Sequence, residues 1–324
     1  MHFIEHIKWT KEILFSSLEA VVLFFQELSS FIALKRRVPR DKEALAMAIR
    51  KRGHHVEKYV LVKPLYDALP DAGLWAKQLE EYVKIWDQKY KTNTPDIQWA
   101  RRMVEEYKNS AAKGEGCIVR SKLMGGTVKT IQDAIYQRQS FRVFKDTPVE
   151  KEKILQLIKA AQHAPNSCNR QTLSYIAIDN PVIKETVAKT IPGGDPFARK
   201  APLLLMVLAD KREYRFPQER FTPYQDAAAA IQNILLLTKS LELGACWCSY
   251  VSYSGIKEEK KIRKLLFIPE LSLICGIIVI GYPAQFVCPV LRRPAQEVLF
   301  KDTMGNPFEY KPTGTGNLNP KKEA

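Results

Sequence analysis

Two arginines and a serine alternate along one short stretch of this chain, at Arg138, Ser140 and Arg142. Side chains of an extended segment point alternately to its two faces, so we expect these three on the same face. Two guanidinium groups beside a hydroxyl offer many hydrogen-bond donors, which suits a phosphate or an anionic ring edge. Closely spaced arginines are also common on solvated surfaces, and the stretch alone leaves that alternative open.

The residues that follow predict what positions this stretch. The sequence TPVE at residues 147–150 has the form of a capping box, with proline at the first helical position. Apolar residues then recur at helical spacing from Ile154 to Ala161. We expect this helix to end at the polar loop of residues 164–171, which reads APNSCNRQ.

Together these segments resemble the nitroreductase family of flavoproteins, whose members read R-x-S-x-R-x-F, then a helix, then A-P-S-x-x-N-x-Q-P. This chain reads RQSFRVF at residues 138–144 and APNSCNRQ at residues 164–171. The resemblance covers roughly residues 127–300. It implies bound FMN, NADH or NADPH as the electron donor, and a homodimer with the flavin at the subunit interface.

The resemblance also implies which residues bind the cofactor. Arg138 matches the arginine that holds the FMN phosphate, Arg142 a cation near the pyrimidine edge of the flavin, and Arg292 a late basic residue that closes on the phosphate. Asn166 stands where the family usually has serine, and Val290 where it often has lysine. The implied cofactor-binding set is Arg138, Gln139, Ser140, Arg142, Pro165, Asn166, Ser167, Asn169, Cys248, Ser249, Tyr250, Val251 and Arg292.

Two further segments bear on the chemistry. Residues 244–252 match the family's turn whose backbone N–H faces the flavin N5, which in this chain belongs to Tyr250 or Val251. Residues 210–225 carry arginines and aromatic rings, which favour either a planar or anionic substrate or an ordinary interface. We expect no catalytic side chain, because FMN carries the hydride transfer and the protein binds it and shapes the substrate pocket.

The leading interpretation is an FMN-dependent oxidoreductase that transfers hydride between NAD(P)H and a small, planar or anionic organic substrate by a ping-pong mechanism. Two alternatives stay open. One is an FMN-dependent dehydrogenase or oxidase of a biosynthetic intermediate. The other is a non-catalytic, flavin-binding scaffold for an acidic partner.

The elements that must position these residues form an α+β pattern. Strands are predicted at residues 173–178, 203–209 and 273–280, and helices from Asp226 to Leu243, ended by Gly244, and at residues 257–267. No G-x-G-x-x-G follows a strand, which argues against a Rossmann dinucleotide site. The family resemblance implies a mixed central sheet flanked by helices.

The first part of the chain is predicted to be all helical. Residues 13–34 are apolar enough to suggest a membrane span, but Glu19 and Glu27 are costly in hydrocarbon and the apolar residues recur at steps of three and four. We therefore expect a packed helix and no transmembrane segment. Glycines near residue 125 divide a helical domain, 1–125, from an FMN-binding domain, 126–324.

Composition limits the possible size of the core, the possible partners and the location of the protein. A chain of 324 residues with 46% hydrophobic content can bury a sizeable core. A net charge of +15 favours anionic partners, but we find no nucleic-acid-binding module and expect no nucleic acid partner. The six cysteines lack zinc-type spacing, and His54 and His55 are adjacent and point in different directions on a helix, so no metal site is expected. Free thiols favour a cytoplasmic location.

Overall fold

The fold is taken from a computed structural model. The structure describes residues 18, 21–22, 24–25, 42–62, 72–113, 128–191, 193–214, 216–248, 250, 255–284 and 292–308. Within the helix predicted over residues 13–34, the structure describes only residues 18, 21, 22, 24 and 25, and all five are helical. Among the described residues, no helix combines the length and the apolar composition that crossing a membrane requires.

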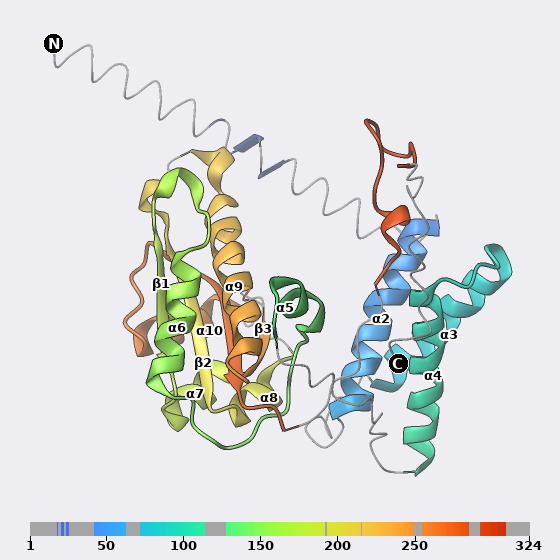
Figure 1. Ribbon diagram of the computed structural model, residues 1–324, viewed down its shortest axis with the longest axis horizontal. Helices are drawn as coiled ribbons and strands as arrows, with labels where there is room; N and C mark the ends of the chain where they lie inside the picture. Colours follow the sequence, from blue (N-terminus) through green and yellow to red (C-terminus); the bar gives the residue numbers. More distant parts are fainter. Residues whose placement is uncertain are drawn as a thin grey trace.

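Three helices near the start of the chain pack against one another: α2 (Lys42–Val62), α3 (Ala72–Lys89) and α4 (Pro95–Lys113) (Figure 1). On α3 the buried residues are Ala72, Ala76, Leu79, Val83 and Trp86, which recur at steps of three and four. That spacing puts them on one face of the helix. The hydrophobic core that they join contains described residues from 45 to 107 only.

The paired histidines lie inside α2. The His55 ring lies 4.8 Å from the Trp75 ring, and His54 Nδ1 lies 3.2 Å from a carboxylate oxygen of Glu57. In the part of the chain that the structure describes, no group of three or more metal-ligating side chains occurs. These contacts give the histidines packing and hydrogen-bonding roles within the helical unit.

The rest of the described chain is built on one sheet. Its strands are β1 (Leu173–Ile178), β2 (Leu203–Asp210), β3 (Gly244–Cys248) and β4 (Ser272–Gly281), paired antiparallel in the order β1-β2-β4-β3. The predicted strands at 173–178, 203–209 and 273–280 are confirmed to within one residue. β3 occupies the first half of the segment that was expected to be a turn, which is a correction.

Helices cover both faces of this sheet. One face is covered by α6 (Lys151–Gln162) and α9 (Thr222–Ser240), and the other by α7 (Pro181–Ala188), α8 (Asp195–Lys200) and α10 (Gly255–Leu265) (Figure 1). Leu203, Leu205 and Val207 of β2 face the first pair, whereas Leu204 and Met206 face the second group. A strand buried on both faces reads as one continuous apolar run. The predicted α+β class is confirmed.

Strand β4 contains a bulge that the sequence did not indicate. Val207 pairs with Gly276 but Leu208 pairs with Ile274, so Cys275 is left without a partner on β2. Before the bulge Ile274 faces α7, α8 and α10, and after it Ile277 faces the same side. An extra residue in one strand shifts the alternation by one, so the even-numbered residues change face along β4.

The predicted start of α6 is wrong. The TPVE sequence at residues 147–150 does not cap the helix, which begins at Lys151, and Glu150 has an extended backbone with φ −65° and ψ 142°. The Glu150 carboxylate instead accepts a hydrogen bond from Tyr282 Oη at 2.8 Å. This long-range contact replaces the local capping interaction that the sequence pattern predicts.

The predicted bounds of α9 are also wrong. The helix begins at Thr222 rather than Asp226, with Pro223 in its first turn, where a missing N–H costs nothing. It ends at Ser240, and the left-handed residue after it is Glu242, with φ 61°. Gly244 does not end the helix but begins β3.

Candidate functional site

A cleft of about 630 Å³ lies beside α5 (Ile131–Gln137), β3 and α9. It brings Arg292 together with three predicted cofactor residues that are distant from it in the sequence, Arg138, Gln139 and Ser140. The remaining described residues that line it are Ile135, Tyr136, Gln232, Leu235 and Trp247. The cleft therefore has a cationic part, contributed by two arginines, and an apolar part that includes an indole ring.

Short-range and long-range contacts fix the stretch from Arg138 to Phe141. A capping box between Thr130 and Asp133 starts α5, and Arg138 is the first residue after the helix, with an extended backbone. Ser140 forms a parallel bridge with Ala245 of β3, and the Phe141 N–H donates to Ala245 O at 3.0 Å. The extended conformation expected for this stretch is thus enforced by pairing with the sheet.

Close packing on Gly244 makes that pairing possible. A Cβ atom built at Gly244 would lie 2.7 Å from Phe141 Cγ, which is too short for a carbon–carbon contact. The Phe141 ring is buried and fills the space that a larger residue at 244 would need. Glycine is therefore required here for close approach, not for its backbone freedom.

The two arginines of the cleft, Arg138 and Arg292, form no ion pair with a carboxylate of the described residues. Burial, and then the positive charge of Arg292, lower the pKa of Arg138. The adjacent Arg293, by contrast, donates from its Nε to Glu297 at 3.3 Å. Two cations on one cleft favour an anionic ligand.

Trp247 is a cleft residue that sequence reasoning missed. Its side chain is 39% exposed although most of β3 is buried, and its indole Nε1 lies 2.7 Å from the position of a Cβ built at Gly276. Glycine in β4 thus leaves room for the indole against the sheet. A tryptophan between two cysteines in a buried strand was the available signal, but its direction depends on the pairing of β3.

The other predicted residues near β3 lie elsewhere or are not described. Arg142 is not among the described residues that line the cleft, and neither is Cys248. The Tyr250 side chain is buried in the core beneath α7, α8 and α10. Ser249 and Val251 lie outside the described residues. A role for these five residues in binding the cofactor stays a prediction.

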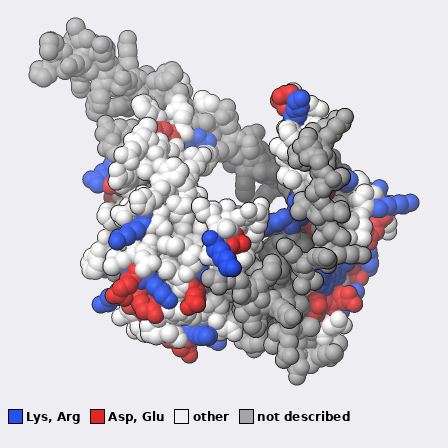
Figure 2. Space-filling view, in the orientation of Figure 1, with Lys and Arg blue, Asp and Glu red and all other residues white. Residues whose placement is uncertain are grey.

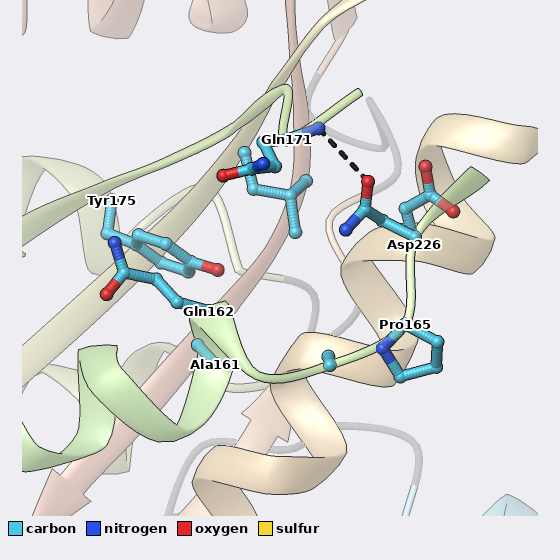
Figure 3. A pocket seen from close by; sticks show the side chains of 9 residues that line it. Ala161, Gln162, Pro165, Gln171, Tyr175 and Asp226 are labelled. Atoms are coloured by element: carbon cyan, nitrogen blue, oxygen red, sulfur yellow. Dashed lines mark hydrogen bonds between the residues drawn. The ribbon is translucent and has the colours of Figure 1, made fainter. Parts of the chain in front are cut away.

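Pro165 and Asn166 line a second, smaller pocket of about 140 Å³ (Figure 3). It lies between the end of α6, the loop of residues 164–172, β1 and the beginning of α9. Its other lining residues are Ala161, Gln162, Ala164, Gln171, Leu173, Tyr175 and Asp226. None of the described residues lines both this pocket and the arginine cleft, so the two groups of predicted cofactor residues line separate pockets.

The loop of residues 164–172, called the cofactor loop below, has an unusual backbone. Cys168, Asn169 and Gln171 have φ angles of 53°, 52° and 51°, in the left-handed region that non-glycine residues seldom adopt. The Gln171 N–H donates to Asn166 Oδ1 at 3.0 Å, a bond drawn dashed in Figure 3. Gln171 Nε2 also donates to Asn169 Oδ1 at 3.3 Å. Asn166, Asn169 and Gln171 therefore stabilise the loop from within.

A buried carboxylate contacts the same loop from α9. Asp226 is 7% exposed, and its Oδ1 accepts a hydrogen bond from the Ser167 N–H at 3.0 Å. Its Oδ2 accepts from Tyr214 Oη at 2.7 Å, and Tyr214 Oη lies 2.8 Å from Thr172 Oγ1. Burial raises the pKa of Tyr214 to about 12, which keeps the phenol protonated at neutral pH.

The segment of residues 210–225 presents aromatic rings to the surface. Phe216, Phe221 and Tyr224 are all exposed, and the Arg220 guanidinium lies 4.3 Å from the centre of the Phe221 ring. Exposed aromatic side chains are suited to flat ligands and to interfaces alike. On the face shown in Figure 2, by contrast, basic and acidic side chains are intermingled, as expected for an ordinary solvated surface.

Comparison with known proteins identifies the family. The sequence model of the nitroreductase family matches residues 135–282. A protein of Archaeoglobus fulgidus, named as a candidate NADH dehydrogenase/NAD(P)H nitroreductase, is 30% identical over 149 residues, which are 46% of this chain and 83% of that protein. This chain belongs to the nitroreductase family. Another nitroreductase relative, from Methanothermobacter thermautotrophicus and named in the same way, is 31% identical over 155 residues, 48% of this chain and 78% of that protein.

The family resemblance inferred from residues 138–171 is thereby confirmed, and the protein is an oxidoreductase. A more distant relative, a Bacillus subtilis protein named as an FMN reductase acting with NAD(P)H, is 25% identical over 202 residues, 57% of this chain and 77% of that protein. The part that matches the family model includes α6, the whole sheet and α9. Helices α2, α3 and α4 precede it.

Proposed function

We propose that this nitroreductase binds FMN and uses it to transfer hydride from NADH or NADPH to a small, planar or anionic organic substrate by a ping-pong mechanism. The observation that carries the proposal is the pair of arginines, Arg138 and Arg292, on one cleft, with which no described carboxylate forms an ion pair. A phosphate monoester suits two guanidinium groups, because each can donate two parallel hydrogen bonds to its oxygens. The relative named as an FMN reductase supports the same cofactor.

The cleft fits FMN in size and chemistry. Its volume of about 630 Å³ lies in the range usual for cofactor sites. Arg138 and Arg292 would hold the phosphate, while Gln139 and Ser140 add polar groups beside it and Trp247 supplies an apolar wall. Bound FMN would supply the redox chemistry by accepting a hydride from the nicotinamide and passing it on. The chain itself would bind and orient the cofactor and exclude water, without a catalytic acid or base.

We further propose a homodimer with the flavin at the subunit interface. Pro165 and Asn166 line a pocket separate from the arginine cleft, and a second subunit is the simplest source of a cofactor loop for that cleft. The exposed rings of residues 210–225 would then lie near the substrate. The cysteines of the described chain, Cys168, Cys246, Cys248 and Cys275, form no disulfide bonds with one another, which favours the cytoplasm.

Purification and anaerobic reduction test the proposed function. We expect a yellow dimer that releases FMN, not FAD, on denaturation and loses its colour when NADH or NADPH is added without oxygen. A protein that binds FMN but is not reduced by either donor would be a scaffold. Reduction by an organic substrate alone would indicate the alternative direction, a dehydrogenase or oxidase. Release of FAD, or a yellow and active monomer, would contradict the proposal.

We propose that the helices before residue 126 form a separate domain. The core of α2, α3 and α4 contains no residue of the sheet, and no described residue of these helices lines the arginine cleft. Deletion of residues 1–125 should therefore leave the dissociation constant for FMN within about threefold of the full chain, a difference of about 0.7 kcal/mol. Fluorescence titration of both proteins measures it. Insoluble protein or lost FMN binding would mean that the helices complete the nitroreductase core.

A further inference from the structure

We infer that Asp226 is a positioning residue that holds the cofactor loop, residues 164–172, in the conformation that presents Pro165 and Asn166. The inference rests on the proposed function, because it assigns a purpose to the loop that the FMN site requires. Neither the sequence pattern nor the family resemblance singled out this carboxylate for such a role. Its contacts in the structure carry the argument.

The cofactor loop needs external support because its backbone is strained. Cys168 and Gln171 have left-handed φ angles of 53° and 51°, a conformation that is unfavourable for residues other than glycine. Asn169, with φ 52°, tolerates this conformation better because its short amide can hydrogen-bond locally. A loop with this much unfavourable backbone keeps one shape only where other groups hold it.

Asp226 fixes the backbone of the cofactor loop next to Asn166. The Ser167 N–H, which donates to Asp226 Oδ1 at 3.0 Å, belongs to the planar peptide group that also contains the Asn166 carbonyl. Fixing this N–H therefore fixes the orientation of the peptide that follows Asn166. The Asn166 side chain is held in turn by the Gln171 N–H at 3.0 Å.

The same carboxylate also ties the loop to residues 210–225. Tyr214 Oη donates to Asp226 Oδ2 at 2.7 Å, which leaves its lone pair to accept from Thr172 Oγ1 at 2.8 Å. Arg170 lies over the Tyr214 ring at 4.9 Å and pairs with Glu219 at 2.5 Å. Ser167 in the middle of the cofactor loop and Thr172 at its end are thus both connected, through Asp226 and Tyr214, to the segment with the exposed aromatic rings.

Trypsin provides a direct readout, because Arg170 lies within the loop. We expect Asp226→Ala to be cleaved after Arg170 about tenfold faster than the full-length wild type, both without flavin and with FMN, since local opening controls the rate. The dissociation constant for FMN should rise about tenfold, equivalent to about 1.4 kcal/mol. Asp226→Asn should stay near wild type, because its amide can accept from the Ser167 N–H and donate to Tyr214 Oη.

Two controls separate positioning from general stability. Asp195→Ala removes a carboxylate that pairs with Arg199 on α8, and it should leave both readouts unchanged. Tyr214→Phe, a smaller change, should raise cleavage after Arg170 about threefold, and it decides the matter if Asp226→Ala does not fold. An unchanged cleavage rate in Asp226→Ala, or in Tyr214→Phe when the alanine variant is unfolded, would overturn the inference. If the wild type binds no FMN, the proposed function fails instead, whatever the cleavage rates.

Discussion

Replacing Arg138 and Arg292 together with alanine should raise the dissociation constant for FMN by two to four orders of magnitude. A hydrogen bond to a charged group contributes about 1.5–3 kcal/mol, so two of them account for about 3–6 kcal/mol. Arg138 is half-buried and Arg292 is exposed, so the single Arg138→Ala change should have the larger effect. Flavin fluorescence quenching during titration of the apoprotein measures both.

Riboflavin, which lacks the phosphate, makes this experiment specific. The wild type should bind FMN far more tightly than riboflavin, whereas the double variant should bind the two almost equally. Arg293→Ala is the matched control, because the adjacent guanidinium pairs with Glu297 and does not line the cleft. Should the double variant keep the wild-type preference for FMN, the arginine cleft is not the phosphate site.

A methyl group at position 244 should disturb both stability and the cofactor site. The Cβ of Gly244→Ala would lie 2.7–2.9 Å from three atoms of the buried Phe141 side chain, so the ring or the strand must move. Overpacking of this kind costs about 1–3 kcal/mol of unfolding free energy. Because Phe141 anchors the stretch that contains Arg138 and Ser140, we also expect weaker FMN binding. Urea denaturation and FMN titration measure the two effects.

A double-mutant cycle distinguishes this clash from a general effect of losing glycine. Phe141→Ala removes Cγ and Cδ2, the two nearest of the three atoms that the new methyl group meets, and leaves only the Cβ at 2.9 Å, so Gly244→Ala should cost less in that background. Gly73→Ala in α3 is the control, since its nearest neighbour would be Tyr107 Oη at 3.4 Å and alanine is the better helix former. Equal costs of Gly244→Ala with and without Phe141 would refute the packing argument.

Much of the fold could be predicted because its signals are local. The runs at residues 173–178 and 203–209 are strands in the structure, and the second is apolar throughout because a strand buried on both sides needs apolar residues at every position. The starts of α6 and α9 could not be predicted. The Glu150 carboxylate accepts a hydrogen bond from Tyr282, which is far away in the sequence, and α9 begins at Thr222, before the Asp226 that was expected to start it.

For the candidate site, too, some features could be predicted from local sequence and others could not. The R-x-S-x-R pattern at residues 138–142 predicted an extended stretch with anion-binding side chains, and pairing with Ala245 explains why it is extended. That Arg292 joins Arg138 on one cleft followed from the family resemblance, not from any local pattern. Trp247 was missed because an alternating strand pattern does not say which residue meets a cleft.

The sequence by itself determined which side chains can bind an anion and which segments form helices or strands. Side-chain chemistry and hydrophobic periodicity can be read from residues that are close together in the sequence. Only the tertiary structure decided which residues share a cavity. The bulge at Cys275 reverses the faces of β4, and the burial of Asp226 follows from the contact of α9 with the cofactor loop. Such outcomes depend on contacts between distant segments, whose relative placement no short stretch of sequence encodes.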